Sequence, residues 1–194
     1  MNAPAGPGET WLRGNLRPAA VLAALSAALT LIAVAVALVC GAPLILIGAL
    51  GGAGGLAVVG AGLLAAAAGR PRLQLQGSAL RVRLAPFAVH DVPLEVVECV
   101  FLGSRSLYGM DDTETNDGRR RVATLVLRIA ERATGWRSRP TTRAWGTWED
   151  GNVVCDGRWC EPLTAGVVRE VAQRLLDAKR AAAAAAGTSA GAEP

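Results

Sequence analysis

The chain has 194 residues, of which 52% are hydrophobic and 19% charged, and its formal net charge is +4. A positive charge this small is weak support for nucleic-acid binding and fits a domain that lies close to anionic lipid. The charges are distributed unevenly, because no charged side chain occurs from Ala19 to Gly69. This distribution favours a membrane protein that carries one small extramembrane domain.

An N-terminal arm, residues 1–17, precedes this apolar block, which covers residues 18–69. Gly41-Ala42-Pro43 divides the block into two segments, about 18–40 and 43–68. Each segment predicts a transmembrane helix, since about 20 apolar residues span roughly 30 Å of hydrocarbon. A cleavable signal peptide is the main alternative for the first segment, but its apolar run of about 22 residues exceeds the usual 7–15. We therefore predict an uncleaved two-helix transmembrane hairpin.

The arginines that flank the hairpin predict its orientation. Arg13 and Arg17 precede the first segment, Arg70 and Arg72 follow the second, and the turn between them is uncharged. Positive residues favour the cytoplasmic side, so we expect both termini and the following domain in the cytoplasm, at the inner (plasma) membrane. Trp11 is expected at the membrane interface on that side, or otherwise as a solvated side chain of the arm.

Small residues in the second segment have the spacing that lets helix backbones approach closely. These helix-packing candidates are Gly48, Gly51, Gly52 and Gly55. Matching small residues of the first segment are Ala23, Ser26, Ala27 and Thr30. Packing of the hairpin on itself is the simplest use; homodimerisation and docking to another membrane protein are the alternatives. No ionisable residue lies in either span, which argues against a channel or carrier.

Residues 70–180 predict a small antiparallel β-domain. Alternating apolar and polar residues indicate two strands around Leu73–Gln76 and Leu80–Leu84, joined at Gly77-Ser78. Further strands are expected at 87–91, 96–102, 142–148 and 152–155, although 96–102 could begin with a short helical turn. A strand over 121–131 is apolar on both faces for part of its length and should be central. Asp156-Gly157 predicts a two-residue hairpin turn, with 158–160 as its return strand.

The domain should end in an amphipathic helix that follows Pro162, with Thr164 as its cap. Its apolar stripe is Val167, Val168, Val171, Leu175 and Leu176. Residues 181–194 are Ala, Gly, Ser and Thr-rich and are expected to form a disordered tail after the helix.

About seven short strands followed by one helix is the order of elements in a pleckstrin-homology-like (PH-like) barrel. The segment Val92-Pro93-Leu94-Glu95-Val96-Val97-Glu98-Cys99-Val100 resembles a hydrophobic-Pro-hydrophobic-acidic-x-Val-acidic-x-Val stretch of bacterial PH-like domains. Such domains often follow a two-helix membrane hairpin, as here. The resemblance covers about residues 71–179 and implies a PH-like barrel, but it implies no specific ligand.

Aromatic and cationic residues alternate near the C-terminal half of the domain. The pattern includes Trp145 and Trp148. Its other residues are the candidates for contact with the membrane surface or with a partner: Trp136, Arg137, Arg139 and Arg143. We expect the tryptophans mainly to fill the core or close one end of a barrel. Contact with lipid headgroups, with a protein or with nucleic acid are the alternatives.

Three groups of residues have side chains that could carry chemistry. The acidic loop Asp111–Asp117 could bind a hard cation, but its spacing does not match an EF-hand and a solvated loop is preferred. His90 and Asp91 are neighbours on one strand and should point to opposite faces. Cys155 and Cys160 form no CxxC pair and are expected to be reduced structural thiols in the cytoplasm, or a disulfide if the domain lies outside.

We therefore predict a non-enzymatic integral membrane protein that presents a small binding or scaffolding domain at the membrane surface. The expected partner is the lipid bilayer, with no nucleic acid, cofactor or metal. One alternative is an accessory subunit of a membrane complex that docks through the glycine-rich second helix. A metal-dependent enzyme that uses the acidic loop is the other.

Overall fold

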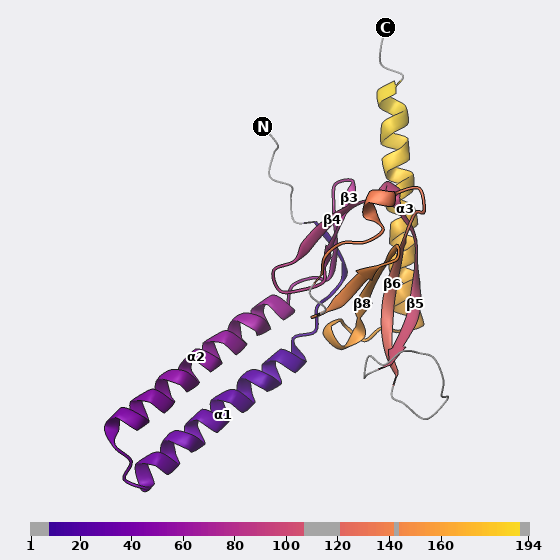
Figure 1. The fold of residues 1–194 in the computed structure, drawn as a ribbon. Helices are drawn as coiled ribbons and strands as arrows, with labels where there is room; N and C mark the ends of the chain where they lie inside the picture. The colour runs from indigo at the N-terminus through magenta and orange to yellow at the C-terminus, as the bar shows by residue number, and fades with distance from the viewer. Residues whose placement is uncertain (1–7, 107–120, 142–143, 191–194) are drawn as a thin grey trace. The chain divides into compact units, whose positions relative to one another are not determined.

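The computed structural model describes residues 8–106, 121–141 and 144–190 (Figure 1). The chain divides into two compact units. One is the segment Asn15–Arg70, and the other combines the residues that precede and follow it. Residues 8–14 of the predicted N-terminal arm therefore belong to the β-domain, whereas the sequence predicted a separate segment.

The first unit is a helical hairpin. α1 (Arg17–Val39) and α2 (Leu44–Ala68) lie side by side in opposite directions (Figure 1). Their bounds agree with the two predicted segments to within one residue. Gly41, with φ of 67°, turns the chain between them, and Pro43 precedes the first residue of α2. By length and composition, both helices can cross a membrane.

The first sheet of the β-domain has the antiparallel order β1-β2-β3-β4. Its strands are β1 (Glu9–Leu12), β2 (Leu73–Gln76), β3 (Ala79–Arg83) and β4 (Val89–Pro93). The predicted hairpin at Gly77-Ser78 is confirmed, whereas β4 begins two residues later than expected. β1 was not predicted, and it places Trp11 in the core with 4% of its surface exposed. Trp11 is thus neither interfacial nor solvated, because pairing of β1 with β2 carries it into the domain.

The second sheet has the antiparallel order β5-β6-β8-β7. Its strands are β5 (Val97–Ser106), β6 (Arg121–Ile129), β7 (Gly146–Glu149) and β8 (Asn152–Asp156). The central position predicted for β6 is confirmed. A short 3-10 helix, η1 (Leu94–Val96), precedes β5, and another, η2 (Thr134–Trp136), follows β6. The described strands pair into two sheets, and no closed barrel is shown by these pairings.

The predicted hairpin at Asp156-Gly157 is wrong. This pair begins a third 3-10 helix, η3 (Gly157–Trp159), and the Asp156 carboxylate accepts the backbone N–H of Arg158 at 2.9 Å. The tight turn lies instead at the preceding Asp-Gly pair, Asp150-Gly151, where both residues have positive φ, 51° and 75°. That conformation suits the twist of the β7–β8 hairpin. The expected return strand is reduced to one bridge, between Cys160 and Gly14.

The C-terminal helix, α3 (Ala165–Ala190), packs against β5, η1 and β1. Thr164 caps it as predicted, since its hydroxyl accepts the N–H of Val167 at 3.3 Å. Val168, Val171 and Leu175 are buried, whereas Leu176 is exposed. The helix includes the first ten residues of the expected tail. One hydrophobic core joins α3 to both sheets.

Candidate functional site

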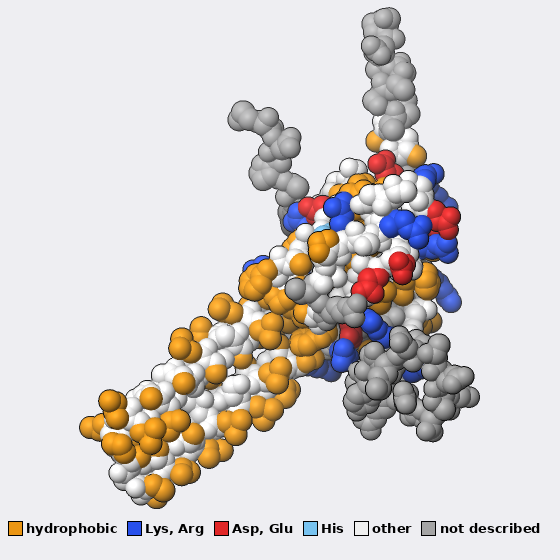
Figure 2. Space-filling view, viewed as in Figure 1, with side chains coloured by type: hydrophobic (Ala, Val, Ile, Leu, Met, Phe, Trp, Pro, Cys, Tyr) orange, Lys and Arg blue, Asp and Glu red, His pale blue; other side chains and the backbone are white. Residues whose placement is uncertain are grey.

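Most of the exposed large hydrophobic side chains of the described residues lie on the helical hairpin. Large aliphatic side chains are exposed along both helices, among them Leu29, Leu31, Ile45 and Leu63. In Figure 2, hydrophobic side chains run the length of the hairpin without Lys, Arg, Asp or Glu between its ends. A contiguous apolar surface of this kind marks a contact with lipid or protein.

The polar groups inside the hairpin are satisfied locally. The hydroxyl of Ser26 donates to the carbonyl of Leu22 at 2.9 Å, and the hydroxyl of Thr30 donates to the carbonyl of Ser26 at 2.8 Å. Helices that satisfy their own backbone and hydroxyl groups in this way are suited to hydrocarbon, where water is absent.

The two helices meet along a stripe of residues spaced three and four apart. On α1 the half-buried residues include Ala23, Ser26, Ala27 and Thr30, as the small-residue spacing predicted. On α2 the half-buried residues include Ile47, Leu50, Gly54 and Val58. A Cβ atom placed on Gly54 would lie 2.5 Å from Oγ1 of Thr30 and 2.8 Å from its Cβ. Gly54 is therefore the residue that permits the close approach.

The glycines predicted for helix packing lie elsewhere. A Cβ atom on Gly48, Gly51, Gly52 or Gly55 would meet nothing within 4 Å. These four glycines therefore do not pack the hairpin on itself, which corrects the simplest interpretation. The stripe Leu50, Gly54, Val58 contained a usable signal, because residues four apart lie on one helix face. The four predicted glycines form an exposed small-residue face.

Arg72 occupies the centre of a buried cluster in the β-domain. Its side chain is 0% exposed, and its guanidinium lies 3.6 Å from the centroid of the Trp145 ring. Its Nε donates to the carbonyl of Trp159 at 2.9 Å, and its backbone N–H donates to the carbonyl of Leu12 at 2.8 Å. Burial lowers the pKa of Arg72 to about 10. Arg72 is thus a structural cation of the domain, whereas the sequence placed it among the membrane-flanking charges.

Two thiols border this cluster. Cys155 and Cys160 are buried and free, as predicted for structural thiols. Burial raises the pKa of Cys155 to about 12 and raises that of Cys160 well above its ordinary value. These thiols are therefore protonated and poor nucleophiles at neutral pH. Cys40 and Cys99 are exposed, so they are the accessible thiols of this chain.

A second cluster stacks aromatic rings beneath a cation. Trp136 lies on Trp148 with ring centroids 6.0 Å apart, and the Arg139 guanidinium lies 4.5 Å from the Trp136 ring. The indole N–H of Trp148 donates to the carbonyl of Trp136 at 2.8 Å. The expected core role is confirmed for Trp145 and Trp148, which are both buried. The exposed Arg137 remains on the surface, and Arg143 lies outside the described residues.

His90 and Asp91 point to opposite faces of β4, as predicted. The His90 ring meets the edge of Trp148 with centroids 5.2 Å apart, and both burial and nearby Arg139 lower its pKa. Asp91 accepts two hydrogen bonds from Arg81, at 2.7 and 2.9 Å, and this contact lowers the pKa of Asp91. The two residues therefore do not form an acid–base pair.

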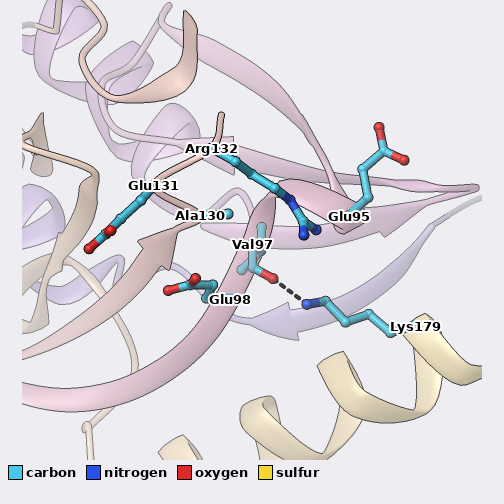
Figure 3. Close-up of a pocket in the computed structure, with 7 residues that line it drawn as sticks. All are labelled: Glu95, Val97, Glu98, Ala130, Glu131, Arg132 and Lys179. Atoms are coloured by element: carbon cyan, nitrogen blue, oxygen red, sulfur yellow. Dashed lines mark hydrogen bonds between the residues drawn. The ribbon is translucent and has the colours of Figure 1, made fainter. Parts of the chain in front are cut away.

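A pocket of about 250 Å³ lies between β5, the end of β6 and α3. Figure 3 shows three carboxylates and two cations around it, contributed by Glu95, Glu98, Glu131, Arg132 and Lys179. The Lys179 ammonium donates to the backbone carbonyl of Val97. Outside the pocket, Arg128 pairs with two of its carboxylates, those of Glu98 at 3.3 Å and Glu131 at 3.2 Å. Small-molecule sites are usually larger, about 300–1,000 Å³, and mainly apolar, so this pocket indicates no ligand class.

Among residues 8–106, 121–141 and 144–190, no group of three or more His, Cys, Asp or Glu side chains could hold a metal ion. The acidic loop Asp111–Asp117 lies outside these ranges, so its predicted solvated state and its alternative role in cation binding both remain predictions.

Comparison of the chain with protein-family models, with curated proteins and with solved structures finds no match.

Proposed function

We propose that this protein is anchored in the inner (plasma) membrane by the α1–α2 hairpin and presents its β-domain on the cytoplasmic side. The domain, PH-like in outline, serves as a non-enzymatic binding or scaffolding module at the membrane surface. The observation that carries the proposal is the apolar exterior of two membrane-length helices. Burying that exterior in a bilayer removes a surface that water solvates poorly.

The orientation rests on the exposed arginines at the open end of the hairpin. Arg13, Arg17 and Arg70 have exposed side chains, whereas the turn at Cys40–Pro43 carries no charge. Positive residues near helix ends are retained in the cytoplasm. Because Arg72 is buried in the β-domain, three flanking arginines remain at the open end of the hairpin and none at its turn.

Native cysteines provide the test, since Cys40 lies at the hairpin turn and Cys99 lies on β5. In intact spheroplasts, a membrane-impermeant maleimide should label Cys40 and leave Cys99 unlabelled until the membrane is permeabilised. Cys40→Ser and Cys99→Ser variants identify each labelled thiol. Labelling of Cys99 before permeabilisation would reverse the orientation, and recovery of the chain in the soluble fraction would refute the anchor.

An accessory subunit of a membrane complex is the second candidate function. The observation that favours it is the open space over Gly48, Gly51, Gly52 and Gly55, because close-packing glycines unused within the hairpin are free to meet another helix. Gly51→Leu should then abolish co-purification of a stoichiometric partner in mild detergent. Ala57→Leu, at another exposed position of α2, is the matched control. A chain that purifies alone and monomeric would count against this role.

A further inference from the structure

The connection between β3 and β4 exposes an apolar side chain to an unusual degree. Leu84 to Val89 are six consecutive apolar residues. The side chain of Phe87 is 95% exposed, more than any other large hydrophobic side chain in the described part of the chain. The base of the connection is held firmly, because Leu84 is buried and its carbonyl accepts the N–H of Trp145 at 2.9 Å. Phe87 is thus exposed on a loop whose base is fixed to the fold.

Strand pairing places this loop at one particular end of the first sheet. Arg83 pairs with Val89 across β3 and β4, and its N–H donates to the carbonyl of Arg72 at 2.9 Å. Arg72 in turn donates its N–H to Leu12, the last residue of β1. The loop therefore lies at the end where the chain leaves β1 for α1 and enters β2 from α2. The Gly77-Ser78 turn lies at the opposite end.

Short tethers join that end of the sheet to the hairpin. Four residues separate Leu12 from α1, and four separate α2 from Leu73. Five Cα steps span at most about 18 Å, even when the chain is fully extended. The chain length therefore sets an upper limit of about 18 Å on the distance from this end of the sheet to the first residue of α1 and to the last residue of α2.

We infer that the β3–β4 loop inserts Phe87 into the headgroup and upper acyl region of the same bilayer. This inference rests on the proposed membrane anchor. Phenylalanine is among the residues that enter this region, to a depth of about 5–10 Å, in segments that lie on membranes. Exposed Arg13 and Arg70 are on the connections that meet this end of the sheet, where they attract anionic headgroups. Two tethers and one inserted loop make three attachments, which hold the domain in a single orientation on the membrane.

The test uses the full chain in nanodiscs of phosphatidylcholine and phosphatidylglycerol. In a Cys40→Ser/Cys99→Ser background, single variants Phe87→Cys, Ser78→Cys and Leu29→Cys each carry an NBD dye. Ser78 is exposed on the opposite turn and is the matched control, and Leu29 reports the middle of α1. Quenching is measured with lipids that carry a doxyl group near the headgroup or deep in the acyl chain.

Shallow doxyl lipid should quench the dye at position 87 by about threefold or more relative to position 78, as expected for a residue about 5–10 Å into the interface. Quenching at position 29 by deep doxyl lipid, without quenching at 87, overturns the inference and leaves the membrane anchor intact. Absence of quenching at 29 removes the anchor and the inference together. Equal quenching at 87 and 78 also contradicts the inference, because it would mean that the domain has no preferred end.

Discussion

Replacing Gly54 with alanine should loosen the helical hairpin, because the new methyl group has no room. It would lie 2.5 Å from Oγ1 of Thr30, about 1 Å less than an ordinary contact of about 3.5 Å. Thr30 cannot easily turn away, since a β-branched side chain in a helix has few rotamers and its hydroxyl is bonded to the Ser26 carbonyl. The helices must therefore separate locally.

The magnitude follows from comparison with a neighbouring glycine. Alanine stabilises a helix by up to about 1 kcal/mol relative to glycine, and overpacking a contact costs about 1–3 kcal/mol. Gly55→Ala gains the helix stabilisation without the cost of overpacking, because its Cβ would meet nothing within 4 Å. The helix term cancels between the two variants, so Gly54→Ala should be less stable than Gly55→Ala by about 1–3 kcal/mol.

The assay is SDS titration of the full chain in mixed micelles, with energy transfer between dyes on the outer faces of α1 and α2. Thr30→Gly, which removes the whole side chain that the new methyl group meets, should restore most of the stability lost in Gly54→Ala. The expected coupling energy of this double-mutant cycle is about 0.5–3 kcal/mol. Equal midpoints for Gly54→Ala and Gly55→Ala, or additivity with Thr30→Gly, would refute the proposed close contact.

Three further predictions concern the β-domain, measured by urea unfolding of the full chain in detergent. Arg72→Met should lower the free energy of unfolding by about 3–4 kcal/mol, because it removes a buried cation–π contact with Trp145 and a charged hydrogen bond. Arg72→Lys should recover little of that stability, since lysine lacks the planar guanidinium. Between pH 9 and 10, the free energy of unfolding should fall, because the folded state keeps the Cys155 proton that the unfolded chain releases. Cys155→Ala should reduce this fall by about 1 kcal/mol over that pH unit, since the unfolded thiol is only partly ionised at pH 9. Thr164→Ala should lower the free energy of unfolding by about 1 kcal/mol, because α3 loses its N-terminal cap. An unchanged urea midpoint would contradict that role.

Elements with a long and consistent pattern were predictable from the sequence. The two helices of the hairpin are defined by uninterrupted apolar runs that end at Gly41 and Pro43. The strand β6 is apolar on both faces for part of its length, a pattern that favours an interior strand, and β6 lies between β5 and β8. In both cases many residues support the same conclusion, so no single contact elsewhere in the fold decides it.

Features decided by distant pairing were not predictable. Two Asp-Gly pairs lie six residues apart, and only pairing of β7 with β8 selects Asp150-Gly151 as the hairpin turn. Trp11 is separated from β2 by the whole hairpin, so its burial depends on β1 joining a sheet whose other strands begin at Leu73. Neither choice leaves a local signal in the residues around it.

The packed face of α2 shows why small-residue spacing alone is ambiguous. α2 contains several glycine pairs with the spacing of a close helix contact, and that spacing does not say which face meets α1. Side-chain size along the whole stripe indicates which face of α2 meets α1. Gly54 lies on the same helix face as Leu50 and Val58, which are half-buried on either side of it in the contact with α1. Gly51 lies outside the contact with α1. A bulky residue at 54 should therefore separate α1 from α2, whereas one at 51 should leave the hairpin intact and disturb only a contact with a second membrane protein.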